Sequence, residues 1–147
     1  MSTTDEDADP FDLERFTRAQ AGVFEQALAE LRAGRKRSHW MWFVFPQIAG
    51  LGKSATAVRF AIGSQREARA YLTHAVLGPR LRTAATVVAE APARDAIALL
   101  GEIDAVKLRS SMTLFAHVAE DAAPFRAVLD RWYGGEEDRV TLDLLGG

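Results

Sequence analysis

The chain contains no cysteine among its 147 residues, and this absence excludes disulfide bonds and thiolate metal sites. Histidine is also scarce. The three histidines, His39, His74 and His117, do not show the spacing of metal ligands. We therefore expect neither a metal site nor a resident cofactor.

Long apolar runs are missing as well. The stretch from His39 to Gly52 carries no Asp, Glu, Lys or Arg, but Pro46 interrupts it and it is too short to span a bilayer. The first ten residues, MSTTDEDADP, are acidic and polar, which is the opposite of a secretory signal. We expect a cytoplasmic protein that does not associate with membranes.

The composition that remains is that of an ordinary globular domain, with 48% hydrophobic and 26% charged residues. A chain of this length can bury one sizeable core without covalent staples. The sequence therefore predicts a disordered acidic N-terminus over residues 1–8 and one domain over residues 9–147.

Charge is distributed unevenly along the chain. Ten of the 18 basic residues, but only one acid, lie between Arg32 and Arg82, and both flanks of this segment are acidic. A basic centre can attract anions, or its arginines can simply pair with the acidic flanks. Nucleic-acid binding through this segment is the weakest alternative, because the pI of about 5.9 is low for such proteins.

Helical periodicity and capping signals cover most of the chain and predict an all-α fold. We expect helices at 10–31, 64–74, 78–88, 93–100, 104–119, 121–133 and 142–145. The segment Trp40–Phe45 is apolar on both faces, so its pattern is compatible with a helix or an extended strand. No other segment offers a comparable strand partner, which favours the all-α reading.

The segment Ser38–Ser54, SHWMWFVFPQIAGLGKS, is the first candidate for a ligand site. Its end resembles a phosphate-binding loop, but Gln47 stands where that loop requires a glycine, which argues against a nucleoside triphosphatase. Lys53 and Ser54 remain candidates for contacting a phosphate. Trp40 and Trp42 are candidates for stacking on a ring, or they are core residues.

The second candidate is the segment Lys107–Phe115. On a helix, Lys107 and Ser110 fall on one stripe with Thr113 and His117, and Arg109 and Ser111 lie to either side. Such a stripe can meet an anionic group, or its serines can bond back onto the helix while the cations face solvent.

The motifs SHWMWFVFPQIAGLGKS, EARAYLTHAVLGPRL, KLRSSMTLF and DRVTLDLLG strongly resemble the domain of unknown function 1810 family. The resemblance runs from about Phe11 to Gly146 and implies a compact all-helical fold, with no established activity. The label calpastatin that is sometimes given to this family does not suit a globular chain, because calpastatins are disordered inhibitors.

We hypothesise that the two segments meet around one pocket for an anionic, phosphate-bearing small molecule such as a nucleotide or an ADP-ribose-like compound. In this hypothesis His39 is the weak candidate for an acid or base. The candidate ligand-binding residues are Trp40, Trp42, Gln47, Lys53, Ser54, Lys107, Arg109, Ser110 and Ser111. A protein-interaction domain ranks second, and neither the oligomeric state nor the presence of catalysis follows from the sequence.

Overall fold

The computed structural model describes residues 9–146, so the predicted disorder of residues 1–8 lies outside the described residues. Ten helices are present in this range: α2 (Glu14–Gln20), α3 (Phe24–Arg32), α4 (Met41–Val44), α5 (Ala55–Arg59), α6 (Gln65–Thr73), α7 (Leu77–Ala89), α8 (Ala96–Leu100), α9 (Glu102–Val118), α10 (Ala123–Tyr133) and α11 (Arg139–Leu144). The described part of the chain contains no strand, which confirms the predicted all-α class.

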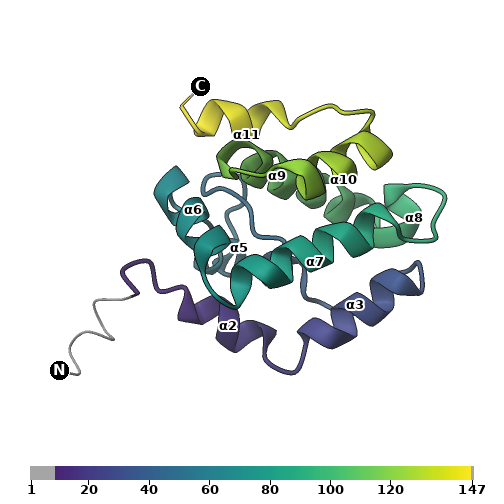
Figure 1. The fold of residues 1–147 in the computed structure, drawn as a ribbon, viewed down its shortest axis with the longest axis horizontal. Coiled ribbons are helices and arrows are strands. Elements are labelled where there is room, and N and C mark those ends of the chain that lie inside the picture. Colours follow the sequence, from purple (N-terminus) through teal and green to yellow (C-terminus); the bar gives the residue numbers. More distant parts are fainter. Residues whose placement is uncertain (1–8, 147) are drawn as a thin grey trace.

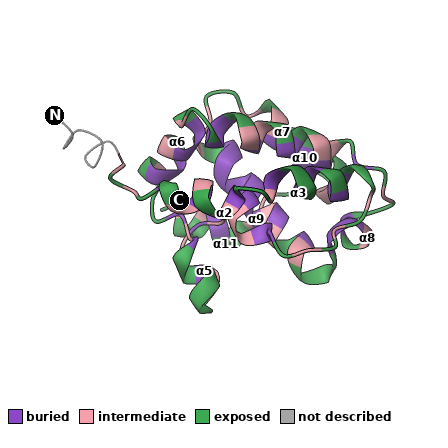
Figure 2. Cartoon of the chain, turned by 90° about the horizontal axis from the view of Figure 1, so that it is seen from below, coloured by how far each residue is buried: buried purple, intermediate pink, exposed green. Residues whose placement is uncertain are grey.

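Helix α9 is the centre of the fold. Leu108, Met112 and Phe115 along it are fully buried, and the helix packs against α4, α6, α8, α10 and α11. Helix α7 packs against α10 and also contacts α3 and α6 (Figure 1). The buried residues form one continuous core, while α5 projects from the body and is mostly exposed (Figure 2).

The prediction of one continuous helix over residues 10–31 was wrong, because this segment forms two helices, α2 and α3. Gly22 between them has a φ of +74°, a left-handed conformation that glycine adopts without steric cost. Gln20 ends α2 and is buried, with its Nε2 donating to the carbonyl of Phe43 at 2.8 Å and to the hydroxyl of Tyr71 at 3.1 Å. The hydrogen bonds of the buried Gln20 side chain to residues far away in the sequence favour the end of α2 at this point. No local sequence pattern predicts these bonds.

Within the segment Trp40–Phe45, residues Met41–Val44 form the single helical turn α4 rather than a strand. The chain becomes extended only afterwards, where Ile48 forms an isolated parallel bridge with Ile62. The bridge consists of two hydrogen bonds, from Ala49 N to the Ile62 carbonyl and from Ile62 N to the Gln47 carbonyl, each 2.8 Å long. This pairing holds the loop after α4 against the segment that follows α5.

The starts of α6 and α9 illustrate how capping signals can succeed or mislead. The Ser64 hydroxyl accepts a hydrogen bond from Glu67 N at 3.1 Å, as the capping pattern predicts. We expected the next helix to begin at Asp104, but α9 begins two residues earlier, at Glu102. It follows Gly101, whose φ is +89°. Asp104 lies inside the first turn, where its carboxylate is free to make tertiary contacts.

No helix in the range 9–146 combines the length and the apolar character that crossing a membrane requires.

Candidate functional site

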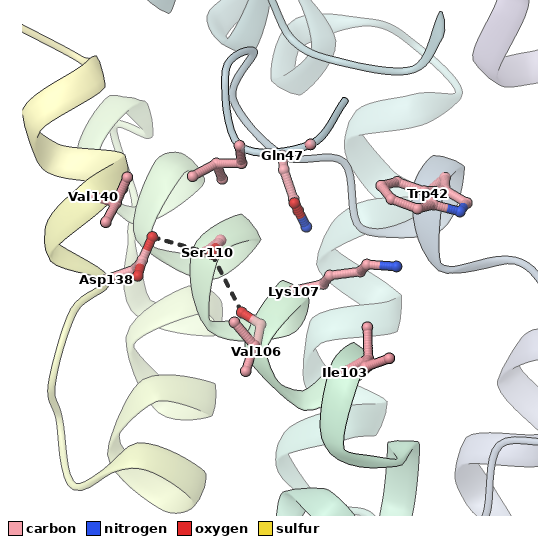
Figure 3. Close-up of a pocket in the computed structure, with 10 residues that line it drawn as sticks. Trp42, Gln47, Ile103, Val106, Lys107, Ser110, Asp138 and Val140 are labelled. Carbon is pink, nitrogen blue, oxygen red and sulfur yellow. Dashed lines mark hydrogen bonds between the residues drawn. The ribbon is translucent and has the colours of Figure 1, made fainter. Parts of the chain in front are cut away.

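A cavity of about 420 Å³ lies between the loop after α4, the first half of α9 and the start of α11 (Figure 3). Its lining residues are Trp42, Gln47, Leu51, Gly52, Ile103, Val106, Lys107, Ser110, Asp138 and Val140. Most of these side chains are apolar, and the polar ones are an amide, a hydroxyl, an ammonium and a carboxylate. This is the usual make-up of a pocket for a small organic molecule.

Helix α9 contributes four lining residues from one face. Ile103, Val106, Lys107 and Ser110 follow the i, i+3, i+4, i+7 spacing that places side chains on the same side of a helix. The sequence predicted a polar stripe that continued from Ser110 to Thr113 and His117. The cavity instead extends toward the start of the helix, where the lining is apolar.

The opposite wall is the loop that carries Gln47 and Gly52. The backbone of Gln47 is held by the bridge to Ile62, and its side chain projects between Trp42 and Ser110 (Figure 3). None of the other lining residues forms a hydrogen bond with the Gln47 amide (Figure 3), so its donors and its acceptor can meet a ligand. Gly52 packs so closely on α5 that a Cβ there would lie 2.7 Å from the Cβ of Ala57.

Lys107 lies against the ring of Trp42. Its Nζ is 3.6 Å from the ring centroid, within the range of a cation–π interaction. The same ammonium is 3.4 Å from Oδ1 of Asp104, one turn earlier in α9. Lys107 is therefore directed toward Trp42 and held at the cavity wall.

Asp104 is shared between two lysines. Its Oδ2 is 2.9 Å from Nζ of Lys36, and Lys36 also donates to the carbonyl of Ser38 at 2.6 Å. The side chains of Lys36, Asp104 and Lys107 are only 9%, 17% and 19% exposed. Two cations and one anion give this poorly solvated cluster one net positive charge, and the carboxylate of Asp138 lies at the other end of the same cavity.

The loop that carries Lys36 is anchored by Glu30 of α3. The carboxylate of Glu30 accepts hydrogen bonds from the Arg37 and Ser38 amides, the Ser38 hydroxyl and Nε1 of Trp40, at 2.6–3.0 Å. Burial disfavours the charged form of Glu30, but these hydrogen bonds outweigh it and lower its pKa from 4.5 to about 2. Glu30 therefore stays ionised and holds the segment that leads into α4.

At the other end of the cavity, Asp138 connects α9 to α11. Its Oδ2 accepts from the Ser110 hydroxyl at 3.1 Å, from Thr141 N at 3.1 Å and from the Thr141 hydroxyl at 2.5 Å. Its backbone N–H donates to the Thr113 hydroxyl at 2.8 Å. These bonds fix the position of the carboxylate, and the Ser110–Asp138 contact is visible in Figure 3.

Four of the predicted ligand-binding residues, Trp42, Gln47, Lys107 and Ser110, line this cavity together. Sequence reasoning missed Asp104 and Asp138. The spacing of Asp104 and Lys107 at i, i+3 was a usable signal for the first. Nothing local marks Asp138, because it reaches the cavity only through the packing of α11 on α9.

The two buried candidates occupy other surroundings. Trp40 is fully buried in the core, with its indole nitrogen bonded to Glu30. Ser111 is also fully buried, and its hydroxyl has no hydrogen-bond partner within the described residues. Neither side chain lines the cavity.

The remaining candidates lie on the surface. Lys53 and Ser54 are exposed, and the Ser54 hydroxyl caps α5 by accepting from Ala57 N at 3.1 Å. Arg109 donates to the carbonyls of Glu136 and Glu137 at 3.0 Å, on the far side of Val106. His39 is exposed and does not line the cavity.

The structure thus defines an all-α domain with a small, mainly apolar cavity that has a lysine at one end and an aspartate at the other. The chain belongs to the family described as Protein of unknown function (DUF1810), whose model matches residues 10–145. It is similar to the conserved hypothetical protein Rv1873 from Mycobacterium tuberculosis, solved as a crystal structure. The two share 52% identity with a TM-score of 0.92, and the match covers 95% of this chain and 99% of the other. No curated protein matches the chain.

Proposed function

We propose that this protein binds a small anionic molecule with an apolar body in the cavity between Trp42 and Asp138. The observation that carries the proposal is the net positive charge of the Lys36–Asp104–Lys107 cluster, whose side chains are less than one-fifth exposed. A charge that is poorly solvated and incompletely paired is costly, and an anion that binds beside it removes part of that cost.

Lys107 is the member of the cluster that is free to meet a ligand. Lys36 already has Asp104 at 2.9 Å and the Ser38 carbonyl at 2.6 Å. Lys107 has only the longer 3.4 Å contact with Asp104 and the face of Trp42. An anionic group at the cavity wall would therefore interact mainly with the Lys107 ammonium, and the Gln47 amide can add a hydrogen bond.

The lining also supports a particular size and charge of ligand. One lysine suits a monoanion such as a carboxylate best; a phosphate monoester, with a charge of about −1.5 to −2 at pH 7, suits it less well, and a pyrophosphate needs several cations or a metal ion. Leu51, Val106 and Val140 offer apolar contacts to the body of the ligand. We therefore expect the ligand to be a smaller and more apolar monoanion than the nucleotides and ADP-ribose-like compounds that the sequence suggested.

The test is a titration of the ¹⁵N-labelled protein with aliphatic and aromatic carboxylates, sugar phosphates, nucleoside monophosphates and ADP-ribose, monitored at the indole N–H of Trp42. We expect a subset of the monoanions to shift this resonance. Lys107→Met should weaken their binding by about tenfold or more, which corresponds to the loss of one charge-assisted contact.

Lys53→Met is the matched control, because Lys53 is exposed and does not line the cavity. Its binding should equal that of the unmodified protein. The proposal is wrong if no anion in the panel shifts Trp42, or if the Lys53 and Lys107 variants lose binding equally.

A protein-interaction role is the second candidate, and one observation favours it. Ile103, Val106 and Val140 line the cavity and Ile97 lines the hollow on the other side of Val106, and all four are more than half exposed. Exposed apolar side chains that gather on one face are typical of interaction surfaces. Sedimentation at several protein concentrations, with Ile103→Asp as the disrupting variant, tests self-association through this face.

A further inference from the structure

We infer that the ligand of this cavity is amphoteric, with an ammonium group at the end opposite its anionic group. The inference rests on the proposed function, since it assigns the second end of the same site. Asp138 is the residue that would meet the donor.

The two oxygens of Asp138 have different surroundings. Oδ2 accepts three hydrogen bonds, from Ser110 and from the amide and hydroxyl of Thr141. Within residues 9–146, Oδ1 accepts none. Asp138 is not among the described residues that bury an unpaired polar side-chain atom, so Oδ1 is accessible. The Asp138 carboxylate thus keeps one accessible oxygen without a partner, on a residue that lines the cavity beside Val106 and Val140.

Asp138 is also held rigidly, which favours recognition. Its N–H is bonded to Thr113 and its Oδ2 is bonded to α9 and α11 together, so the carboxylate does not have to be ordered when a ligand binds. A preorganised acceptor loses little entropy on binding. In mainly apolar surroundings, a bond between a carboxylate and a charged donor is also stronger than it is in water.

The separation of the two ends sets the length of the ligand. Lys107 and Ser110 are one turn apart on α9, about 5 Å along the axis. Figure 3 shows the Lys107 side chain extending toward Trp42, away from Asp138, with Gln47 between them. Lys107 and Asp138 make no ion pair with each other. A ligand that reaches both groups therefore needs a chain or ring system longer than one helical turn.

The decisive probes are octanoate and 8-aminooctanoate, which differ only by the terminal ammonium. A purely apolar pocket with a lysine prefers octanoate, because an ammonium loses hydration on entering it. Recognition by Asp138 reverses this order. We expect 8-aminooctanoate to bind about tenfold more tightly than octanoate, with 4-aminobutanoate too short to gain, in titrations followed at the Trp42 indole N–H.

Asp138→Asn identifies the residue responsible. Asparagine keeps an oxygen for Ser110 and Thr141 and is an equally good helix cap, so the fold is retained. This variant should bind octanoate at least as tightly, because a negative charge is removed from the cavity, and the advantage of 8-aminooctanoate over octanoate should fall to within about twofold. The thermal midpoint of the variant, measured without ligand, verifies that the fold is intact.

The possible failures are separable. If octanoate binds through Lys107 but 8-aminooctanoate binds no better, the proposed function stands and the amphoteric ligand is wrong. If the advantage of 8-aminooctanoate persists in Asp138→Asn, the donor is met elsewhere and the inference is again wrong. If neither probe binds and no other monoanion does, the proposed function itself fails.

Discussion

The ammonium of Lys107 lies 3.6 Å from the centroid of the Trp42 ring, so the one lysine of the cavity is held against its one aromatic side chain. Trp40, two residues earlier, points into the core and bonds to Glu30 through its indole nitrogen. Two tryptophans of the same short segment therefore have different roles. Trp40 stabilises the core, and Trp42 lines the candidate site.

The two tryptophans should separate stability from binding. Trp40→Phe removes a donor from the ionised Glu30 and opens space in a packed core, so we expect a loss of about 2–4 kcal/mol in the free energy of unfolding. Trp42→Leu should cost less stability, because this side chain is partly exposed, but should weaken binding of the monoanions. Urea denaturation and calorimetric titration measure the two effects. Equal stability losses in both variants would contradict this assignment.

Stability should fall as the pH is lowered through the range in which Glu30 titrates. Its pKa is lowered from 4.5 to about 2 in the folded chain, so the native state favours the ionised carboxylate. The contribution, at most about 3 kcal/mol, is complete above about pH 5 and is lost progressively as the pH falls toward 2. Urea denaturation at pH 7, 5, 4 and 3 measures this dependence.

The control for that experiment is Glu30→Gln. The variant should be less stable at pH 7, and its stability should vary less between pH 5 and pH 3 than that of the unmodified protein. An unchanged pH profile in Glu30→Gln would show that other carboxylates are responsible.

Gly52→Ala should destabilise the wall of the cavity. The added Cβ would lie 2.7 Å from the Cβ of Ala57, a distance that requires the loop or α5 to shift. We expect a cost of about 1–3 kcal/mol, as for other overpacked sites. Ala57→Gly removes the opposing methyl group at a cost of about 1 kcal/mol for glycine in a helix. The double variant should therefore be more stable than the sum of the two changes predicts, and simple additivity would contradict the proposed clash.

Ser111→Ala should be neutral or stabilising by up to about 1 kcal/mol, because the Ser111 hydroxyl is buried without a hydrogen-bond partner in the described chain. Thr113→Val is the matched comparison on the same helix. The Thr113 hydroxyl accepts from Asp138 N at 2.8 Å and donates to the Arg109 carbonyl at 2.8 Å. Its loss leaves the partly buried amide of Asp138 without a partner and should cost about 1–3 kcal/mol in thermal or urea unfolding. A larger loss from Ser111→Ala than from Thr113→Val would contradict this interpretation.

Much of the helical architecture could be read from local patterns. The apolar spacing along α9 and α10, the Ser64 cap of α6 and the glycine at 134 that ends α10 are properties of neighbouring residues. The break between α2 and α3 was missed because it accompanies the bonds of Gln20 to Phe43 and Tyr71, which are far away in the sequence. The helical turn at Met41–Val44 was left open because an apolar segment of that length suits either conformation.

The candidate site was predictable in part for the same reason. The aromatic segment and the first half of the Lys107–Phe115 segment do meet at one cavity, and Trp42, Gln47, Lys107 and Ser110 line it. Composition, however, cannot tell which of two tryptophans or two serines faces inward. Trp40 and Ser111 are buried, whereas Lys53 and Arg109 lie outside the cavity, so the expected cluster of several cations reduces to one lysine.

By itself, the sequence determined the helical class of this protein, most of its helices and the two segments that carry the site, because periodicity, caps and composition act over a few residues. The tertiary structure alone decided the charge balance of the cavity. Asp104 joins Lys36 to Lys107, and Asp138 arrives from α11, through contacts between helices. Electrostatic interactions depend on distance in space and on burial, and neither quantity is written in the order of the residues.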